Sequence, residues 1–205
     1  MKDLILYIHG KNGSSNEAEH YKFLCESYEV IGLEYYGFTP QDTKKEFLAA
    51  YENYLSRNYE SISIIANSIG AFFAMNAFQN KKILQAFFIS PIVDMEELIL
   101  KMMTFSGISE SELEHEREIT TASGETLSWE YLRYVREHKI IWRVPTKILY
   151  GEKDNLTSLE TIKNFAAKTS SELTIMKNGE HWFHTDEQMN FLDDWLISRI
   201  KKPEA

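Results

Sequence analysis

The sequence predicts an α/β protein, a three-layer sandwich in which helices cover both faces of a mostly parallel sheet. Strand-like apolar segments and helix-like amphipathic segments alternate along most of the 205 residues, which is the pattern of βαβ units. Apolar runs such as Leu4–Ile8 lack the polar–apolar alternation of half-exposed strands, so they suit strands that are buried on both faces. The length favours a single domain over residues 1–205.

Strand and helix signals follow one another in order, and turn residues separate them. The predicted strands comprise residues 4–8, 28–35, 61–65, 83–90, 145–151 and 173–176. The predicted helices comprise residues 16–27, a segment that begins at Pro40, the segment from Gly70 to about residue 80, residues 158–168 and residues 187–200. Parallel strands joined through helices imply right-handed crossovers.

The alternation stops between Ile92 and Arg143. This stretch of about 50 residues has a helical apolar pattern with a polar middle, and an insertion of this length between two strands is typical of a lid or cap. We therefore expect a helical cap at about residues 92–143. Its apolar side chains include Met102, Met103 and Trp129, which are predicted to contact substrate because ligand pockets have mainly apolar linings.

Composition excludes some partners and favours a compartment. The net charge of −9 without a basic patch argues against nucleic acid. Cys25 is the only cysteine, which rules out an intrachain disulfide and favours a reducing compartment, so a cytoplasmic location is predicted. Its helical apolar context predicts a buried side chain. The N-terminal residues suit a first strand better than a signal peptide, and no apolar run is long enough to span a membrane.

The pentad Ala66–Gly70 lies between a predicted strand and a predicted helix. Its small-x-Ser-x-small pattern is that of a nucleophile elbow, in which small residues let the strand and helix close around a strained central residue. Ser68 would then stand exposed beside the helix N-terminus. The alternative is an ordinary turn in which Ser68 caps the helix.

Other loops at the same sheet edge carry the groups that a nucleophilic serine needs. The loops after the first, third, fifth and sixth predicted strands contain His9-Gly10, Ser68, Asp154 and His181. Ligands in such sheets bind beyond the carboxyl ends of the strands, where these loops converge. A serine needs a base to take its proton, and the base needs a group that orients it. The chain order Ser68, Asp154, His181 is the expected one for this architecture.

With these motifs the chain resembles the α/β-hydrolase superfamily over nearly its whole length. His9-Gly10-Lys11-Asn12-Gly13 is similar to the family's HGxxG oxyanion loop, residues 150–154 are similar to its G-x-x-D acid turn, and Gly179-Glu180-His181 is similar to its histidine loop. The resemblance implies the α/β-hydrolase fold, shortened at its front, with a helical cap insertion. It also implies an oxyanion hole made by the backbone N–H groups of Lys11 and Ile69.

Two positions depart from the family pattern. Ala66 stands where glycine is more common, and Asn67 stands where histidine is most common and has no predicted role. His9 is expected to support the oxyanion loop.

Asp94 competes with Asp154 as the acid, because the acid can also follow the strand ahead of the cap, but the Gly151 turn favours Asp154. His184 competes with His181 as the base, but His181 directly follows the Gly179 loop. The spacing of these histidines with Asp186 is weak for a metal site, so no metal and no cofactor is predicted.

The expected function is that of a carboxylesterase-like serine hydrolase, which cleaves a small or medium uncharged acyl ester through an acyl-enzyme on Ser68. No cationic cluster is present to receive a charged substrate. An amidase, a peptidase or a thioesterase with the same triad is an alternative, as is a non-catalytic ligand-binding protein of this fold. Dehalogenase and epoxide-hydrolase branches of the family are disfavoured because they have Asp at the elbow. The predicted partner is a small-molecule ester, and the sequence does not predict an oligomeric state.

Overall fold

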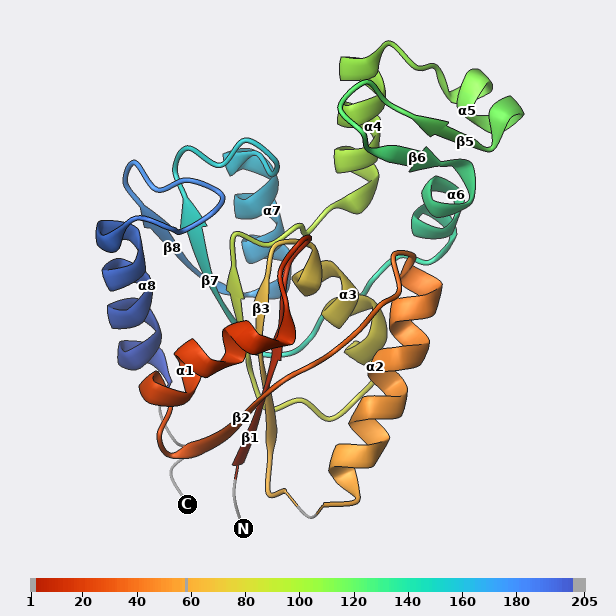
Figure 1. Ribbon diagram of the computed structural model, residues 1–205. Helices are drawn as coiled ribbons and strands as arrows, with labels where there is room; N and C mark the ends of the chain where they lie inside the picture. Colours follow the sequence, from red (N-terminus) through yellow and green to blue (C-terminus); the bar gives the residue numbers. More distant parts are fainter. Residues whose placement is uncertain (1–2, 58, 201–205) are drawn as a thin grey trace. The chain divides into compact units, whose positions relative to one another are not determined.

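A computed structural model describes residues 3–57 and 59–200 of the chain (Figure 1). It divides into two compact units: residues Asp94–Ile141 form the second unit, and the rest of the described chain forms the first. The boundaries of the second unit lie close to those of the predicted insertion. Each unit has its own secondary structure, and all the residues of the predicted triad belong to the first.

The first unit is built on a six-stranded sheet with the order β2-β1-β3-β4-β7-β8, in which every neighbouring pair is parallel. Its strands are β1 (Asp3–Ile8), β2 (Tyr28–Gly32), β3 (Ile62–Asn67), β4 (Ala86–Ile89), β7 (Thr146–Gly151) and β8 (Glu172–Met176). All six correspond to predicted strands, and only their ends differ. The predicted three-layer α/β class is therefore confirmed.

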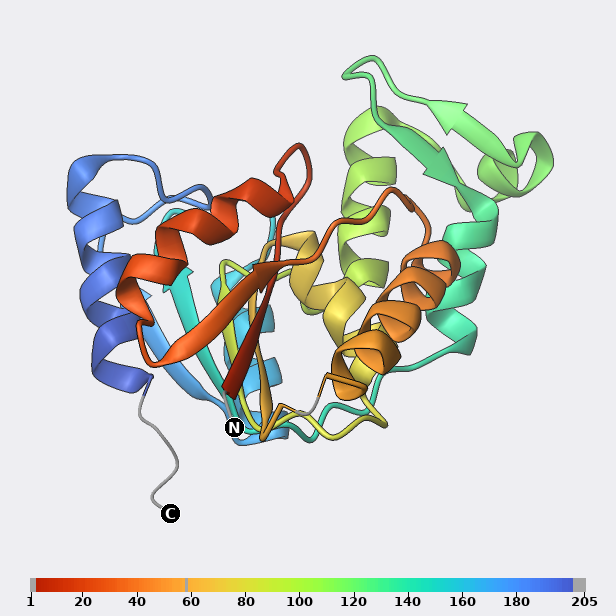
Figure 2. The same cartoon turned by 60° about the horizontal axis from the view of Figure 1, so that its bottom comes forward.

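The direction of each crossover decides which face a helix covers. The first-unit helices are α1 (Ala18–Leu24), α2 (Pro40–Leu55), α3 (Ile69–Phe78), α7 (Leu159–Thr169) and α8 (Asp186–Arg199). The chain moves one way across the sheet from β1 to β2 and the other way for every later crossover. Right-handed connections therefore place α1 on one face and α2, α3 and α7 on the other. The C-terminal helix α8 lies beside α1 on the same face of the sheet, as two views show (Figures 1 and 2).

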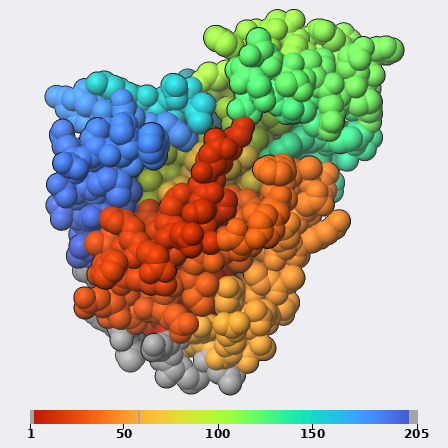
Figure 3. Space-filling model, in the orientation of Figure 1, coloured from red at the N-terminus to blue at the C-terminus, as the bar shows by residue number. Residues whose placement is uncertain are grey.

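The strands bury both faces, because successive side chains point to opposite sides of the sheet. Ile5 and Tyr7 belong to a core cluster that includes residues of α1 and α8, whereas the equally buried Leu4 and Leu6 point to the other face. In the space-filling view α1 and α8 cover the strands behind them (Figure 3). This two-sided burial explains why Leu4–Ile8 is a continuous apolar run.

One helix prediction is corrected. Residues 16–27 were expected to form one helix, but a short 3-10 turn (Ser15–Glu17) precedes α1, which is only seven residues long. Cys25 lies just after α1 with φ −121° and ψ 46°, outside the helix, although it is buried as expected. Burial raises the pKa of its thiol to about 12.

The second unit contains α4 (Met95–Ser106), α5 (Glu110–Glu116), β5 (Glu118–Thr120), β6 (Thr126–Ser128) and α6 (Trp129–Glu137). Besides the three helices, this segment contains an element that the sequence did not predict, since β5 and β6 form an antiparallel hairpin. Each strand has only three residues, too few for a period-two pattern to show in the sequence.

Arg136 of α6 cross-links this second unit. It donates to Glu96 of α4 at 2.7 Å and to both oxygens of Glu110 of α5 at 2.7 and 2.9 Å. Lys139 adds a further bond to Glu96. Among the helices that the structure describes, none has the length and apolar character to cross a bilayer.

Candidate active site

The site lies where the strand order reverses. From β1 the chain crosses to β2 on one side and then returns to β3 on the other, so the direction of the crossovers changes between β1 and β3, and ligands of such sheets bind at the carboxyl ends of the strands beside that change. Gly10 follows β1 within two residues, and Ser68 directly follows β3. The fold therefore brings the predicted oxyanion loop beside the predicted nucleophile.

Ser68 has the strained backbone of an elbow, with φ 50° and ψ −123°, between the last residue of β3 and the first of α3. Its side chain makes no capping hydrogen bond to α3, which argues against the simple helix-cap alternative. Gly70 shows how tightly the turn closes. A Cβ atom there would lie 2.4 Å from the carbonyl oxygen of His9 and 2.8 Å from that of Ile8, so a larger residue would collide with backbone.

The three predicted triad side chains form one hydrogen-bonded chain. His181 Nε2 is 2.9 Å from Ser68 Oγ, and His181 Nδ1 is 2.7 Å from Asp154 Oδ2. An ionised carboxylate can only accept, so Nδ1–H donates to Asp154 and leaves Nε2 to accept the serine proton. The Asp154 side chain is fully enclosed, and His181 retains 17% exposure. This arrangement can deprotonate Ser68 and stabilise the imidazolium that results.

The enclosed Asp154 carboxylate is held by its own loop. Its second oxygen accepts from the backbone N–H groups of Leu156 at 2.8 Å and Thr157 at 3.1 Å. Thr157 in turn donates its hydroxyl to the carbonyl of Pro91 and accepts from the Tyr150 hydroxyl through its own carbonyl. A buried carboxylate needs a hydrogen-bond partner for each oxygen, and these bonds supply partners for both without a cation.

The acid loop and the histidine loop touch through a glycine. A Cβ at Gly151 would lie 2.3 Å from the carbonyl oxygen of Glu180. The neighbouring Tyr150 is buried, which raises the pKa of its phenol to about 12 and keeps it a hydrogen-bond donor. Close backbone packing at Gly151 thus brings His181 within reach of Asp154.

His9 supports the predicted oxyanion loop. It is buried, its ring stacks on Tyr35 with centroids 4.3 Å apart, and its Nδ1 donates to the Gly10 carbonyl at 2.8 Å. The Tyr35 hydroxyl donates back to the His9 carbonyl at 2.8 Å. Ile69 is the first residue of α3, where N–H groups have no partner within the helix. The roles of Lys11 and Ile69 as oxyanion donors stay predictions.

The alternative residues have other partners. Asp94 lies in the second unit and accepts from the Glu97 N–H at 2.9 Å as the cap of α4. His184 donates to the Trp182 carbonyl at 2.8 Å and stacks on its indole. Neither bonds to a member of the Ser68 chain, so the geometry favours Asp154 and His181.

The remaining predicted site residues lie in the second unit. Met103 is buried, whereas Met102 and Trp129 are half-buried, and their contact with substrate stays a prediction. Within residues 3–57 and 59–200, no group of three or more His, Cys, Asp or Glu side chains is arranged to hold a metal ion.

A hydrogen-bonded connection beneath the elbow was not among the features predicted from the sequence. Asn67 Nδ2 donates to the Tyr7 hydroxyl at 2.8 Å, and the Tyr7 hydroxyl donates to Glu17. One signal could have found it: a tyrosine within a strand buried on both faces needs a partner for its hydroxyl. Burial, the neighbouring Tyr21 and the bond to Glu17 raise the pKa of Tyr7 well above its usual value, so it stays protonated.

Comparisons with solved structures agree with this architecture. Est1E from Butyrivibrio proteoclasticus superposes with a TM-score of 0.75 at 16% identity, covering 96% of this chain and 86% of that one. Mouse alpha/beta hydrolase domain-containing protein 10 superposes with a TM-score of 0.75 at 17% identity, over 97% and 90%. An esterase of Pyrococcus furiosus gives a TM-score of 0.61 at 20% identity, over 97% and 80%.

The chain therefore has the fold of the α/β-hydrolase superfamily, and the predicted resemblance is confirmed at that level. No protein-family profile matches the sequence, and no curated protein is similar to it in sequence.

Proposed function

We propose that the protein is a serine hydrolase that cleaves esters with a small or medium uncharged acyl group. The observation that carries the proposal is the unbroken chain from Ser68 Oγ through His181 to the enclosed Asp154 carboxylate. The esterases among the structural neighbours support hydrolase chemistry on this fold. A binding protein would have no need for all three groups in this geometry.

In the proposed mechanism Ser68 Oγ attacks the acyl carbonyl while His181 Nε2 takes its proton. The carbonyl π electrons move to oxygen, and this oxyanion accepts from the N–H groups of Ile69 and Lys11. His181 then returns the proton to the departing alcohol, which leaves an acyl-enzyme. A water molecule then attacks the acyl-enzyme carbonyl in the same way, with His181 taking its proton and returning it to Ser68 Oγ as the acid is released. Each oxyanion donor contributes on the order of 3 kcal/mol to lowering the barrier.

The substrate range is proposed from the apolar side chains of the second unit. Met102, Met103 and Trp129 are proposed to contact the acyl group. Amide or thioester substrates use the same triad, and structural neighbours include a deformylase and a proline iminopeptidase-related protein. Est1E has been solved with ferulic acid bound, so an aromatic acyl ester belongs in the substrate set.

Covalent labelling tests the nucleophile. A fluorophosphonate probe should label the wild-type protein, and Ser68→Ala should abolish labelling. Labelling that survives this substitution would show that Ser68 is not the nucleophile. Asp154→Asn should retain Ser68 but slow labelling by about 10³-fold or more, because the amide no longer fixes the histidine tautomer.

A substrate panel tests the reaction class. It contains p-nitrophenyl esters of increasing chain length, a hydroxycinnamoyl ester, a thioester and a p-nitroanilide. Turnover of short and medium esters well above the anilide supports the proposal. Preferred turnover of the anilide would favour an amidase. Saturable ligand binding without turnover of any member would favour the non-catalytic alternative.

A further inference from the structure

A polar connection joins the elbow to the far end of the oxyanion loop. Asn67 is the residue immediately before Ser68, and its Nδ2 donates to the Tyr7 hydroxyl at 2.8 Å. The Tyr7 hydroxyl donates to Glu17, whose other oxygen accepts the Ser14 N–H at 3.0 Å. Three side chains therefore link β3, β1 and the loop that contains Lys11.

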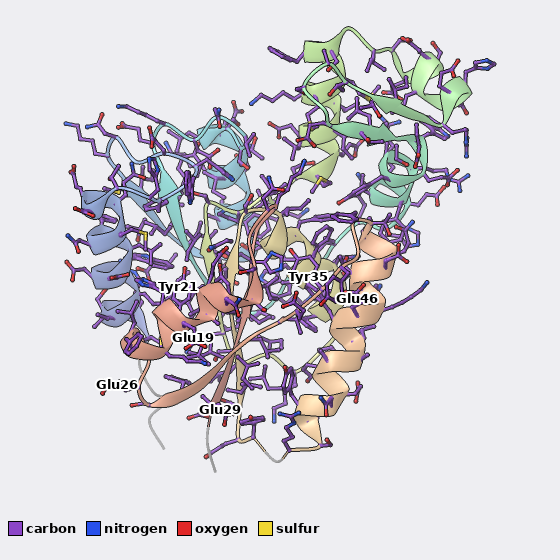
Figure 4. The ribbon with its side chains drawn as sticks, viewed as in Figure 1. Glu19, Tyr21, Glu26, Glu29, Tyr35 and Glu46 are labelled. Atoms are coloured by element: carbon purple, nitrogen blue, oxygen red, sulfur yellow. The ribbon has the colours of Figure 1, made fainter. Side chains whose placement is uncertain are left out.

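The strand register places these side chains on one face of the sheet. Tyr7 pairs with Ile65 in the parallel β1–β3 ladder, so Asn67, two residues further on, projects to the same side as Ile65 and Tyr7. That side is the one covered by α1, from which Tyr21 stacks on the Tyr7 ring with centroids 4.9 Å apart. Figure 4 labels Tyr21 on this helix. The ring of Tyr7 is thereby packed against Tyr21.

The donor and acceptor order in the connection allows one arrangement. Tyr7 has a single hydroxyl proton, and Glu17, as a carboxylate, can only accept it. Asn67 must then donate through Nδ2, which fixes the orientation of its amide. Because Tyr7 is fully buried, its hydroxyl cannot replace these hydrogen bonds with bonds to water. The connection is thus a defined link with few alternative geometries.

We infer that Glu17, Tyr7 and Asn67 are positioning residues, which set the distance between the two oxyanion donors. Ile69 follows the elbow that Asn67 begins, and Lys11 lies in the loop that Glu17 holds through Ser14. The connection therefore ties together the two segments that supply the donors. This inference rests on the proposed function and assigns a role to Asn67 within it.

The kinetic consequence differs from that of simple destabilisation. A displacement of one donor affects the transition state, in which negative charge develops on oxygen, more than it affects ground-state binding. Tyr7→Phe should therefore lower kcat by about ten-fold or more, while KM changes by less than about two-fold.

An oxyanion-dependent inhibitor supplies a readout that a merely structural role would not change. A trifluoromethyl ketone forms a hemiketal when Ser68 Oγ bonds to its carbonyl carbon, with the proton passing to His181 and the electron pair to oxygen. Its Ki in Tyr7→Phe should rise by the same factor by which kcat/KM falls. Binding of the product acid, which forms no tetrahedral oxyanion, should stay unchanged.

Two further variants and a control complete the test. Glu17 has an exposed side chain, so Glu17→Ala is expected to fold and to show the same kcat loss. Glu17→Gln keeps only one of the two acceptor oxygens, so its kcat should lie between those of wild type and Glu17→Ala. Tyr51→Phe is the matched control. Tyr51 is equally enclosed and donates to the Lys82 carbonyl at 3.2 Å from α2, on the opposite face of the sheet.

The outcomes separate this inference from the proposed function. If wild-type protein is neither labelled nor active on the panel, the proposed function is wrong. If it is active but Tyr7→Phe and Glu17→Ala lose no more kcat per folded molecule than Tyr51→Phe, only the positioning role is wrong. An unchanged Ki for the ketone, or a loss confined to KM, would also overturn that role.

Discussion

Gly70→Ala tests whether backbone packing at the elbow positions the oxyanion loop. The added Cβ would lie 2.4 Å from the His9 carbonyl oxygen, about 1 Å inside ordinary van der Waals contact. Its second neighbour, at 2.8 Å, is also backbone, so no flexible side chain can yield. The end of β1 must move by a substantial part of an ångström, and the His9 carbonyl that accepts from Tyr35 moves with it.

This displacement should reduce both stability and rate. Forcing atoms into a packed site costs about 1–3 kcal/mol of unfolding free energy. A shift approaching 1 Å in a group that stabilises the transition state costs on the order of 10²-fold in kcat. Urea unfolding monitored by tryptophan fluorescence measures the first quantity, and initial rates on the best ester of the panel measure the second.

Ala74→Gly is the matched control in the same helix. Ala74 is fully buried in the middle of α3, and glycine there lowers stability by about 1 kcal/mol without pressing on β1. It should keep kcat per folded molecule near the wild-type value. A Gly70→Ala protein with wild-type stability and a kcat within about two-fold of wild type would refute the reasoning.

Two other predictions concern the charged cross-link and the buried thiol. Hydrogen bonds from Lys139 and Arg136 lower the pKa of Glu96, and those from Arg136 lower the pKa of Glu110. The stability that these carboxylates contribute is therefore complete above their unfolded pKa of about 4.5, and it is lost as the pH falls through their folded pKa values. Arg136→Ala should therefore lower the thermal midpoint at pH 7 but have a smaller effect near pH 3, as calorimetry can measure; an equal loss at both pH values would contradict this. The Cys25 thiol, with its pKa raised to about 12, should react with Ellman's reagent only slowly at pH 8 until the protein unfolds in urea, and rapid reaction of native protein would contradict its burial.

Much of the first unit could be predicted because its signals are local. Burial on both faces makes a strand such as Leu4–Ile8 continuously apolar, and the steric demands of the elbow leave small residues at Ala66 and Gly70. The secondary structure of the insertion was harder to predict. The hairpin of β5 and β6 depends on cross-strand pairing and a turn with Gly124 at φ 84°, which a helical periodicity in the surrounding residues conceals.

The candidate site was likewise predicted in part from the sequence and decided in part by contacts in the folded protein. The order of Ser68, Asp154 and His181 along the chain predicted which residues meet, because parallel strands deliver their loops to one edge. The rival histidine, His184, differs from His181 in its contacts and not in residue type. The stacking of His184 on Trp182 and the bond of His181 to Ser68 are properties of the folded loops.

The sequence by itself determined the fold class and the small-residue turn that holds Ser68, since each depends on periodicity or on residue size within a few positions. Only the tertiary structure decided what depends on distance between segments. His181 lies 113 residues from Ser68 and 2.9 Å from it in space, and Asn67 meets Tyr7 from 60 residues away. Such contacts follow from strand register and crossover direction, which no short stretch of sequence specifies.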